Sequence, residues 1–359
     1  MAPLLAACVM APTSLPATAK VPPTSADASP SGVTETTSGT SPSAPSSPTG
    51  TPANAGELRL TVAGDFGSTS ATTKVLGRVG EIRPDANLML GDLSYGKTGE
   101  EAKWCSYAGG LTGDTPNYLV AGNHEANGED GLIDDFITCM PAPGKVQGAY
   151  AQQYWVDLPA KKPLVRVIFI SPGVDFGEGR LNYDQGTARY QWTADAIDDA
   201  RADGIPWVFV GTHKLCISAG KYGCEVGRDI TRLLLDRHVD LAFTGHEHIY
   251  QRSKQLAAGV SGCPELVVGR YAEACVSDAD DQLTAGAGTV FVTVGTGGTR
   301  LRNLSPRDSE AGYFRSWSAG NREPSHGFVS ISLSKNELSA SFDNAGTGGF
   351  TDSFTISRR

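Results

Sequence analysis

The sequence contains no run of lysine or arginine, and its 39 acidic residues outnumber its 30 basic residues to give a formal net charge of -9. A nucleic-acid groove and a patch for anionic membranes both need concentrated positive charge, so neither partner is expected. If the substrate is anionic, a bound metal ion is the natural source of attraction.

Long apolar runs and closely spaced cysteine pairs are also missing. No segment after the first residues approaches the ~20 consecutive apolar residues of a membrane-spanning helix. None of the 7 cysteines has the Cys-x-x-Cys spacing of a zinc site or redox motif. Apart from Cys8, many connectivities are open, and the local one joins Cys105 with Cys139, Cys216 with Cys224, and Cys263 with Cys275. Structural disulfides in an exported protein are the interpretation that this pattern favours.

The beginning of the chain does not have the composition of a folded domain. Residues 5–8 read LAAC, which resembles the lipobox of bacterial lipoproteins, so we expect residues 1–10 to be the remainder of a signal region and Cys8 to carry a lipid anchor. Residues 11–56 are rich in Ser, Thr, Pro, Ala and Gly, which predicts a disordered linker because little surface can be buried. The expected location is therefore outside the cell, either as a cell-surface lipoprotein or as a secreted protein.

Short apolar segments alternate with amphipathic stretches in residues 57–359. Strand-like segments occupy residues 58–63, 87–90, 117–121, 206–210 and 240–244, and helix-like patterns occupy residues 188–202 and 225–238. This alternation predicts an α/β fold, and the strand-rich part after residue 290 predicts an antiparallel addition. Each strand-like segment is followed closely by glycine and polar residues. Ligands bind at the carboxyl ends of strands in α/β sheets, so these residues are expected to converge.

The side chains at these strand ends are groups that bind metal ions. They are two carboxylates, a phenol, an amide and imidazoles, namely Asp65, Asp92, Tyr95, Asn123, His124, His213, His246 and His248. One tetrahedral zinc ion takes about four ligands, so this set suits two ions that share a carboxylate. Each residue alone has a structural explanation, such as a strand-to-turn junction for Gly-Asp. Their joint occurrence at successive strand ends supports a metal site.

The order of these residues resembles the calcineurin-like metallophosphoesterases and, within them, the purple acid phosphatases. The blocks of that subgroup occur in order as GDFG at Gly64, GDLSY at Gly91, GNHE at Gly122, VGTH at Val210 and GHEH at Gly245. The resemblance covers the chain from residue 58 onward, including GTGG and REPSHGF near the end. It implies a four-layer α/β/β/α sandwich with mixed sheets, and residues 57–359 as one catalytic domain.

Tyr95 distinguishes the subgroup, because a phenolate is a hard, strongly donating ligand that favours a trivalent ion. Ordinary members of the family have a histidine where this chain has Gly67. The resemblance implies that Asp65, Tyr95 and His248 hold Fe(III) and that Asp92 bridges to the second ion.

The second ion implied by the resemblance is divalent, either Fe, Zn or Mn, and is held by Asn123, His213 and His246. His124 is the implied catalytic residue, which stabilises the phosphoryl oxygens or protonates the leaving group. The implied reaction is hydrolysis of phosphomonoesters by metal-activated hydroxide, with extracellular phosphate scavenging as the expected role.

The chain departs from the pattern after the VGTH block, where many members carry further histidines and this chain has KLCISAGKYGCEVG. Lys214, Lys221 or Tyr222, on a loop closed by Cys216 and Cys224, are the candidates to replace them. Plant-type members also carry an N-terminal β-sandwich, where this chain has the linker. Two alternatives stay open: a phosphodiesterase that uses the same site, and a non-catalytic surface protein that binds metal or phosphate.

Overall fold

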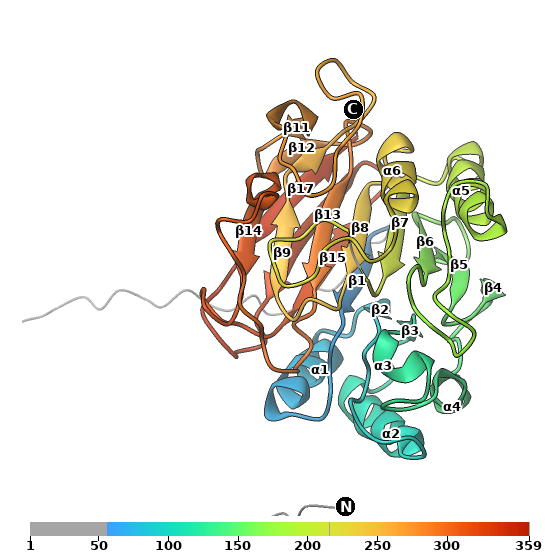
Figure 1. Ribbon diagram of the computed structural model, residues 1–359. Helices are drawn as coiled ribbons and strands as arrows, with labels where there is room; N and C mark the ends of the chain where they lie inside the picture. Colours follow the sequence, from blue (N-terminus) through green and yellow to red (C-terminus); the bar gives the residue numbers. More distant parts are fainter. Residues whose placement is uncertain (1–55, 215, 359) are drawn as a thin grey trace, which may run out of the picture. The chain divides into compact units, whose positions relative to one another are not determined.

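The computed structural model describes residues 56–214 and 216–358 (Figure 1). The predicted lipobox with Cys8 and nearly all of the predicted linker lie outside these residues. None of the described helices has the length and apolar character that crossing a membrane would require.

The described chain contains strands throughout its length. In chain order they are β1 (Leu58–Ala63), β2 (Ala86–Met89), β3 (Asn117–Leu119), β4 (Gln147–Ala149), β5 (Gln153–Leu158), β6 (Val165–Ile170), β7 (Trp207–Thr212), β8 (Leu241–Thr244), β9 (Tyr250–Ser253), β10 (Gln255–Leu256), β11 (Val276–Asp278), β12 (Gln282–Thr284), β13 (Val290–Val294), β14 (Phe314–Ser318), β15 (Phe328–Leu333), β16 (Glu337–Asp343) and β17 (Ser353–Ser357).

The helices are concentrated in the first two thirds of the domain. They are α1 (Ser70–Ile82), α2 (Glu101–Thr112), α3 (Asn123–Ala126), α4 (Ile133–Cys139), α5 (Ala188–Ala202) and α6 (Arg228–Asp236), with short 3-10 turns at Glu273–Cys275 and Ala311–Tyr313.

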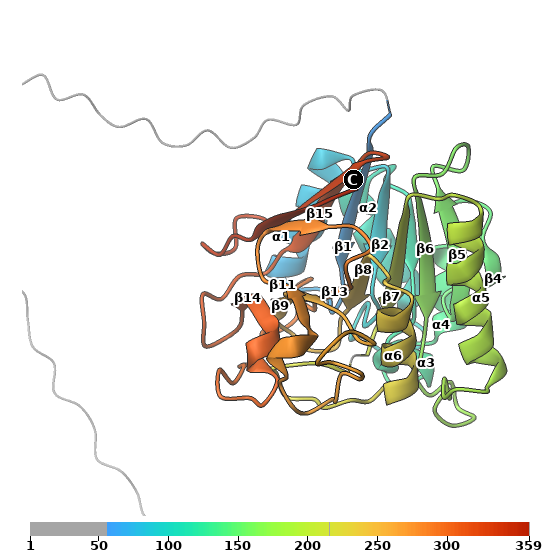
Figure 2. The same ribbon diagram turned by 90° about the horizontal axis from the view of Figure 1, so that it is seen from above.

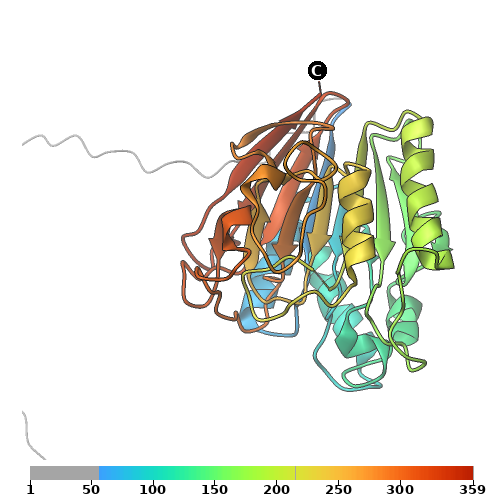
Figure 3. The same ribbon diagram turned by 45° about the horizontal axis from the view of Figure 1, so that its top comes forward.

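Two large mixed sheets form the centre of the domain. One has the strand order β12-β17-β16-β15-β1-β2-β3 and the other has the order β14-β9-β13-β8-β7-β6-β5-β4. The sheets lie against each other, with α1 and α2 on the outer side of the first and α5 and α6 on the outer side of the second (Figures 2 and 3). The predicted four-layer α/β/β/α sandwich is confirmed.

Strand β6 shows why the central strands of these sheets are continuous apolar segments in the sequence. All six of its residues are buried, which is expected when both faces of a sheet are covered. Val167 and Phe169 belong to the core between the two sheets, whereas Ile168 and Ile170 pack with Ile197 of α5. Alternate side chains of one strand therefore fill two different cores.

The sequence correctly predicted the positions of most of the strands whose ends carry polar residues, and of one helix. The predicted helix 188–202 coincides with α5, and the five predicted strands match β1, β2, β3, β7 and β8 to within two residues at either end. The predicted helix 225–238 is too long, because α6 begins at Arg228. Gly227 has a φ of 89°, which is outside the helical region, and Glu225 lies in the loop before it.

The local disulfide pairing is confirmed for all three pairs, Cys105 with Cys139, Cys216 with Cys224, and Cys263 with Cys275. The first joins α2 to the end of α4, and the second closes the loop between β7 and α6. Covalent closure of these loops limits the conformations of the unfolded chain.

A buried ion pair joins the two sheets behind the histidine loop. Arg252 of β9 donates from Nε and Nη2 to both carboxylate oxygens of Asp352, at 2.7 and 2.8 Å. Asp352 immediately precedes β17 in the other sheet, and it also accepts a hydrogen bond from Tyr250 at 2.6 Å. The bidentate geometry and the exclusion of water make this a strong charge-assisted contact.

We expect Asp352→Asn to reduce the free energy of unfolding by about 3 kcal/mol, because Arg252 would keep a buried charge without its buried counterion and would be paired only with the more exposed Asp281. The Arg252 and Asp352 side chains are only 1% and 7% exposed. Asp281 also contacts Arg252 but is 40% exposed, so Asp281→Asn is the matched control and should cost less than about 1 kcal/mol. Urea unfolding followed by circular dichroism measures the free energy of unfolding of both variants. Equal losses in the two would contradict a stabilising role of the buried Arg252–Asp352 ion pair.

Candidate metal centre

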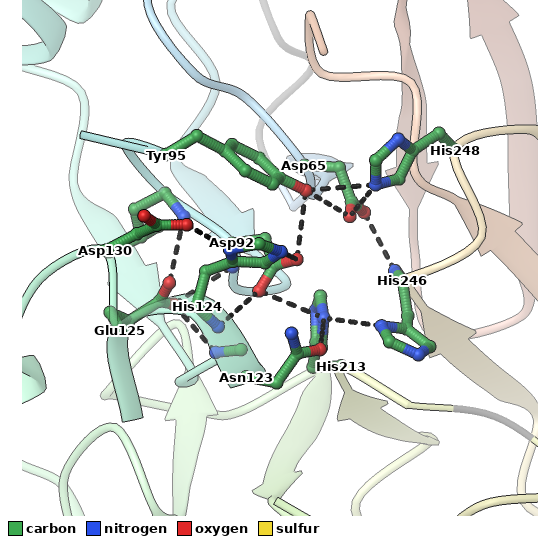
Figure 4. Close-up of polar contacts among 12 residues, drawn as sticks. Asp65, Asp92, Tyr95, Asn123, His124, Glu125, Asp130, His213, His246 and His248 are labelled. Carbon is green, nitrogen blue, oxygen red and sulfur yellow. Dashed lines mark hydrogen bonds and ion pairs between the residues drawn. The ribbon is translucent and has the colours of Figure 1, made fainter. Parts of the chain in front are cut away.

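The predicted donor residues come together at the carboxyl ends of strands from both sheets (Figure 4). Asp65, Asp92 and Asn123 follow the parallel strands β1, β2 and β3 of the first sheet. His213 follows β7, and the His246–His248 turn follows β8, in the second sheet. The site therefore lies where the carboxyl ends of the parallel strands of one sheet meet those of the other sheet.

Tight backbone turns direct these side chains inward. Asp65, Asp92, Tyr95 and His246 all have positive φ angles, at 62°, 51°, 48° and 66°. Such conformations cost about 1 kcal/mol or more for a residue with a Cβ atom, and they cluster at functional sites. Gly122 allows a close approach of the backbone, since a Cβ atom there would lie 2.1 Å from Asp92 Oδ1.

Two groups of donor atoms share one carboxylate. Asp65, Asp92 and His248 form one group, and Asp92, His213 and His246 form the other, with the atoms of each group lying within 4.8 Å of one another. Either group could hold a metal ion, and Asp92 is the residue common to both. This is the arrangement that a bridging carboxylate between two ions requires.

Tyr95 and Asn123 add one further donor to each group. The Tyr95 hydroxyl lies 3.0 Å from Asp65 Oδ1 and 3.0 Å from His248 Nε2. Asn123 Oδ1 lies 3.2 Å from His213 Nε2. All seven residues predicted as ligands thus lie in one cluster, and their roles as metal ligands stay a prediction.

The outer nitrogen of each imidazole in the cluster is bound to an acceptor. His213 Nδ1 donates to the Leu90 carbonyl at 2.7 Å, and His248 Nδ1 donates to the Arg300 carbonyl at 3.0 Å. His246 Nε2 donates to Glu225 Oε2 at 2.7 Å. When the imidazoles are neutral, these bonds fix their tautomers, so that every inner nitrogen presents a lone pair to the centre.

The interior of the cluster is consequently crowded with acceptors. His213 Nε2 lies 3.2 Å from both Asp92 Oδ1 and His246 Nδ1, which are also acceptors in the neutral site. Lone pairs at this distance repel unless a proton or a cation lies between them. Two ligands that are each about 2.0–2.1 Å from one ion lie about 3 Å apart, so the spacing fits metal coordination.

Electrostatics show how the side chains share protons when no cation is present. Burial raises the pKa of Asp92, but His213 outweighs this effect and holds the pKa well below its ordinary value. Burial lowers the pKa of His213, and the charges of Asp92 and Asp65 overcome it to raise the pKa to about 9. Burial and both carboxylates raise the pKa of Tyr95, so its phenol stays protonated until a cation displaces the proton.

Glu125 stabilises the turns that carry the donor residues, and it belongs to neither donor group. Its buried carboxylate accepts from the backbone nitrogens of Asp92, Leu93 and Gly122 at 2.9, 3.2 and 2.7 Å. Burial and the charge of Asp92 raise its pKa to about 7. Glu125 thereby fixes the turn after β2 to the turn after β3.

His124 stands at the edge of the cluster and is partly exposed. Its Nδ1 is hydrogen-bonded to Asp130, and its Nε2 lies 3.7 Å from Asp92 Oδ2. The ring packs on Tyr95 with centroids 4.4 Å apart. His124 is therefore near both donor groups but belongs to neither, and Nε2 is the nitrogen turned toward them.

The loop that lacks the family's histidines reaches the centre through other residues. Tyr222 stacks on His246 with ring centroids 4.2 Å apart, and Lys214 Nζ lies 3.4 Å from Glu225 Oε1. The hydrogen bond with His246 is the main reason that the pKa of Glu225 falls to about 2. The sequence predicted Lys214, Lys221 and Tyr222 as replacements but placed Glu225 on a helix.

Sequence reasoning also missed Asp130 as the partner of His124. The only signal was an acidic residue six positions after His124, in a loop where acidic residues are common. Neither Asp130 nor Glu225 stands at a strand end, so the pattern that found the ligands could not find them.

We expect Glu225→Ala to weaken zinc binding by about 10- to 100-fold, because the tautomer and orientation of His246 would no longer be fixed. Glu225→Gln keeps an acceptor oxygen and should lose less. Competition with a chromophoric chelator measures the affinity, and Glu178→Ala, at an exposed loop position, is the control. An unchanged affinity in Glu225→Ala would mean that His246 is oriented by its neighbours alone.

Comparisons with known proteins agree with this geometry. Residues 58–250, more than half of the chain, match the calcineurin-like phosphoesterase family. Purple acid phosphatase 18 of Arabidopsis thaliana is 25% identical over 286 residues, which cover 76% of this chain and 58% of that protein. The probable inactive purple acid phosphatase 24 of the same plant is 26% identical over 320 residues, covering 81% and 46%. The chain thus spans about half the length of these curated relatives.

The fold agrees with a solved structure as well. Purple acid phosphatase PPD1 from yellow lupin seeds superimposes with a TM-score of 0.58 at 19% identity, over 84% of this chain and 54% of that one. The matched family region includes every strand end that supplies a donor residue. The chain belongs to the calcineurin-like phosphoesterase family, in its purple acid phosphatase-like subgroup.

Proposed function

We propose that the protein hydrolyses phosphomonoesters at a centre of two metal ions. Fe(III) would be held by Asp65, Tyr95 and His248, and Asp92 would be shared with the second ion. The observation that carries the proposal is the pair of donor groups joined at Asp92, with lone pairs turned inward. Family membership supports a hydrolase of phosphate esters.

The second ion, which is divalent Fe, Zn or Mn in this proposal, would be held by Asn123, His213 and His246. When bound, the two ions would make water acidic enough to serve as a nucleophile and would neutralise charge on the phosphoryl oxygens. The amide of Asn123 is a neutral ligand, so the ligands at this position carry less negative charge than those at the position with Tyr95. That difference favours a divalent over a trivalent ion here.

His124 would act on the leaving group in this proposal. Asp130 accepts the hydrogen bond from Nδ1, and the bond holds the ring so that Nε2 faces the donor groups. A proton on Nε2 could then pass to the leaving alcohol oxygen or stabilise the phosphoryl oxygens. Asp130 is a positioning residue, since it acts through His124.

The three disulfides support a protein that works outside the reducing cytosol. Phosphate scavenging at or beyond the cell surface, with Cys8 as a lipid anchor, is the role proposed for it. The first 10 residues as a signal remnant, residues 11–56 as a tether and residues 57–359 as the catalytic domain complete this proposal.

We expect the protein purified without added metal to show a visible charge-transfer band from Tyr95 to Fe(III). Tyr95→Phe should remove the band because phenylalanine has no oxygen donor. Tyr107→Phe is the control, since that exposed hydroxyl contacts Thr73 rather than the centre. Metal analysis accompanies the spectra, and a colourless protein with full metal content would rule out a ferric tyrosinate site.

Replacing His124 and Asp92 separates catalysis from metal binding. His124→Ala should lower kcat for an aryl phosphomonoester by about 10²- to 10⁴-fold while the metal content stays unchanged. Asp92→Asn should lose metal and activity together, because both donor groups contain Asp92. His238→Ala is the control, since His238 contacts the carbonyl of Gly286.

The same variants test the two alternatives. A diester with the same leaving group is assayed beside the monoester, and turnover of the diester alone would identify a phosphodiesterase. A metal-loaded wild-type protein that hydrolyses neither ester would favour the non-catalytic surface protein.

A further inference from the structure

A cavity of about 540 Å³ lies directly beside the metal centre, on the side of His248. It is lined by Lys221, His248, Thr299, Arg300, Leu301, Arg302 and Asn303. Three of these seven residues are cationic, and none is a carboxylate. The lining is therefore cationic in a chain whose formal net charge is -9.

The segment 299–303 is attached to the loops that carry the ligands. The Arg300 carbonyl accepts from His248 Nδ1 at 3.0 Å, and the Arg302 nitrogen donates to the His248 carbonyl at 2.9 Å. Thr299 donates from its backbone to the Asp65 carbonyl at 3.0 Å, and its own carbonyl is bonded to His326. The backbone of Arg300, from which its side chain projects, is therefore fixed relative to the centre.

The other wall of the cavity comes from the disulfide loop. Lys221 lies between Gly220, which packs on the buried Glu247 carboxylate, and Tyr222, whose ring stacks on His246. Lys221 Nζ lies 4.8 Å from the centroid of the Tyr222 ring. The loop thus brings a cation to the cavity without adding a carboxylate to its lining.

Two of the cations are available for a ligand, whereas the third is occupied. Arg302 donates from Nη1 to the His246 carbonyl at 2.8 Å and lies over the Tyr222 ring. Lys221 and Arg300 are exposed, and neither takes part in an ion pair with any residue that the structure describes. Arg302 therefore supports the wall, and the other two side chains can turn toward an anion.

We propose that this cavity binds a second phosphoryl group of the substrate, so that the preferred substrates are small molecules with two or more phosphoryl groups. The inference rests on the proposed function, which places the phosphoryl group to be hydrolysed at the neighbouring centre. A phosphoryl dianion matches both the guanidinium fork of Arg300 and the point charge of Lys221. It can belong to a bisphosphorylated alcohol or to a nucleoside diphosphate.

Binding tests the cavity independently of turnover. The metal-loaded protein is titrated by calorimetry with an alkyl bisphosphonate on a three-carbon linker and with the matching monophosphonate, neither of which can be hydrolysed. The bisphosphonate should bind roughly tenfold more tightly, and high salt should reduce the difference because both cations are exposed.

The double variant Lys221→Gln, Arg300→Gln should remove this difference while metal content stays the same. The double variant Lys162→Gln, Lys335→Gln is the matched control. Both lysines are exposed, and they lie in the turns between β5 and β6 and between β15 and β16, at the ends of the sheets opposite to the metal centre. This control removes the same charge from the protein and should bind both ligands like the wild type. Equal affinity of the wild type for the two phosphonates would overturn the inference.

Turnover then distinguishes this inference from the proposed function. Release of phosphate from an alkanediol bisphosphate should be roughly tenfold more efficient in kcat/KM than release from the monophosphate, and a nucleoside diphosphate shows whether an anhydride is accepted. Activity without any preference would contradict the cavity assignment alone. Tight bisphosphonate binding without hydrolysis of any ester would support the cavity and overturn the phosphatase proposal.

Discussion

The crowding of hydrogen-bond acceptors around Asp92 is the constraint on which the rest of the centre depends. Carboxylate, amide and imidazole lone pairs face one another at about 3 Å, with the Tyr95 hydroxyl as the donor among them. Such an arrangement is unfavourable unless positive charge lies between the groups. The surrounding structure opposes that repulsion with tight turns after β2 and β8, with Glu125, and with a backbone or carboxylate acceptor for each imidazole.

Three parts of the molecule have distinct tasks around this centre. The strand ends supply the groups proposed to bind metal, and the loops behind them supply Glu225 and Asp130, which are hydrogen-bonded to two of the histidines. The cavity with Lys221 and Arg300 lies beside the centre, and nothing in it belongs to either donor group except His248. In the two proposals, the chemistry and the preference for substrate therefore depend on different side chains.

The sequence predicted the α/β fold, the disulfide pairs and the polar strand ends that converge, because each depends on short-range patterns, whereas the sandwich was implied by the family resemblance. Alternating apolar segments, glycine followed by a polar side chain, and neighbouring cysteines are all visible within a few positions. It did not predict Glu225, because the apolar spacing of α6 continues in front of Gly227 and reads as helix. It did not predict the role of Arg300 either, since its contact with His248 joins residues 52 positions apart.

The stretch GHEHIYQR carries two of the histidines proposed to bind metal and, four residues after His248, the arginine that joins the two sheets. Lengthening or shortening it would move the imidazoles and the inter-sheet ion pair out of register together, so its length cannot drift without loss of both. The loop between Cys216 and Cys224 is bound to the same stretch, because Gln251 is hydrogen-bonded to Ser218 and Ala219 and Tyr222 stacks on His246. Lys221 is exposed at the tip of this loop, so it is a position where the side chain can change while the buried contacts of the loop are kept.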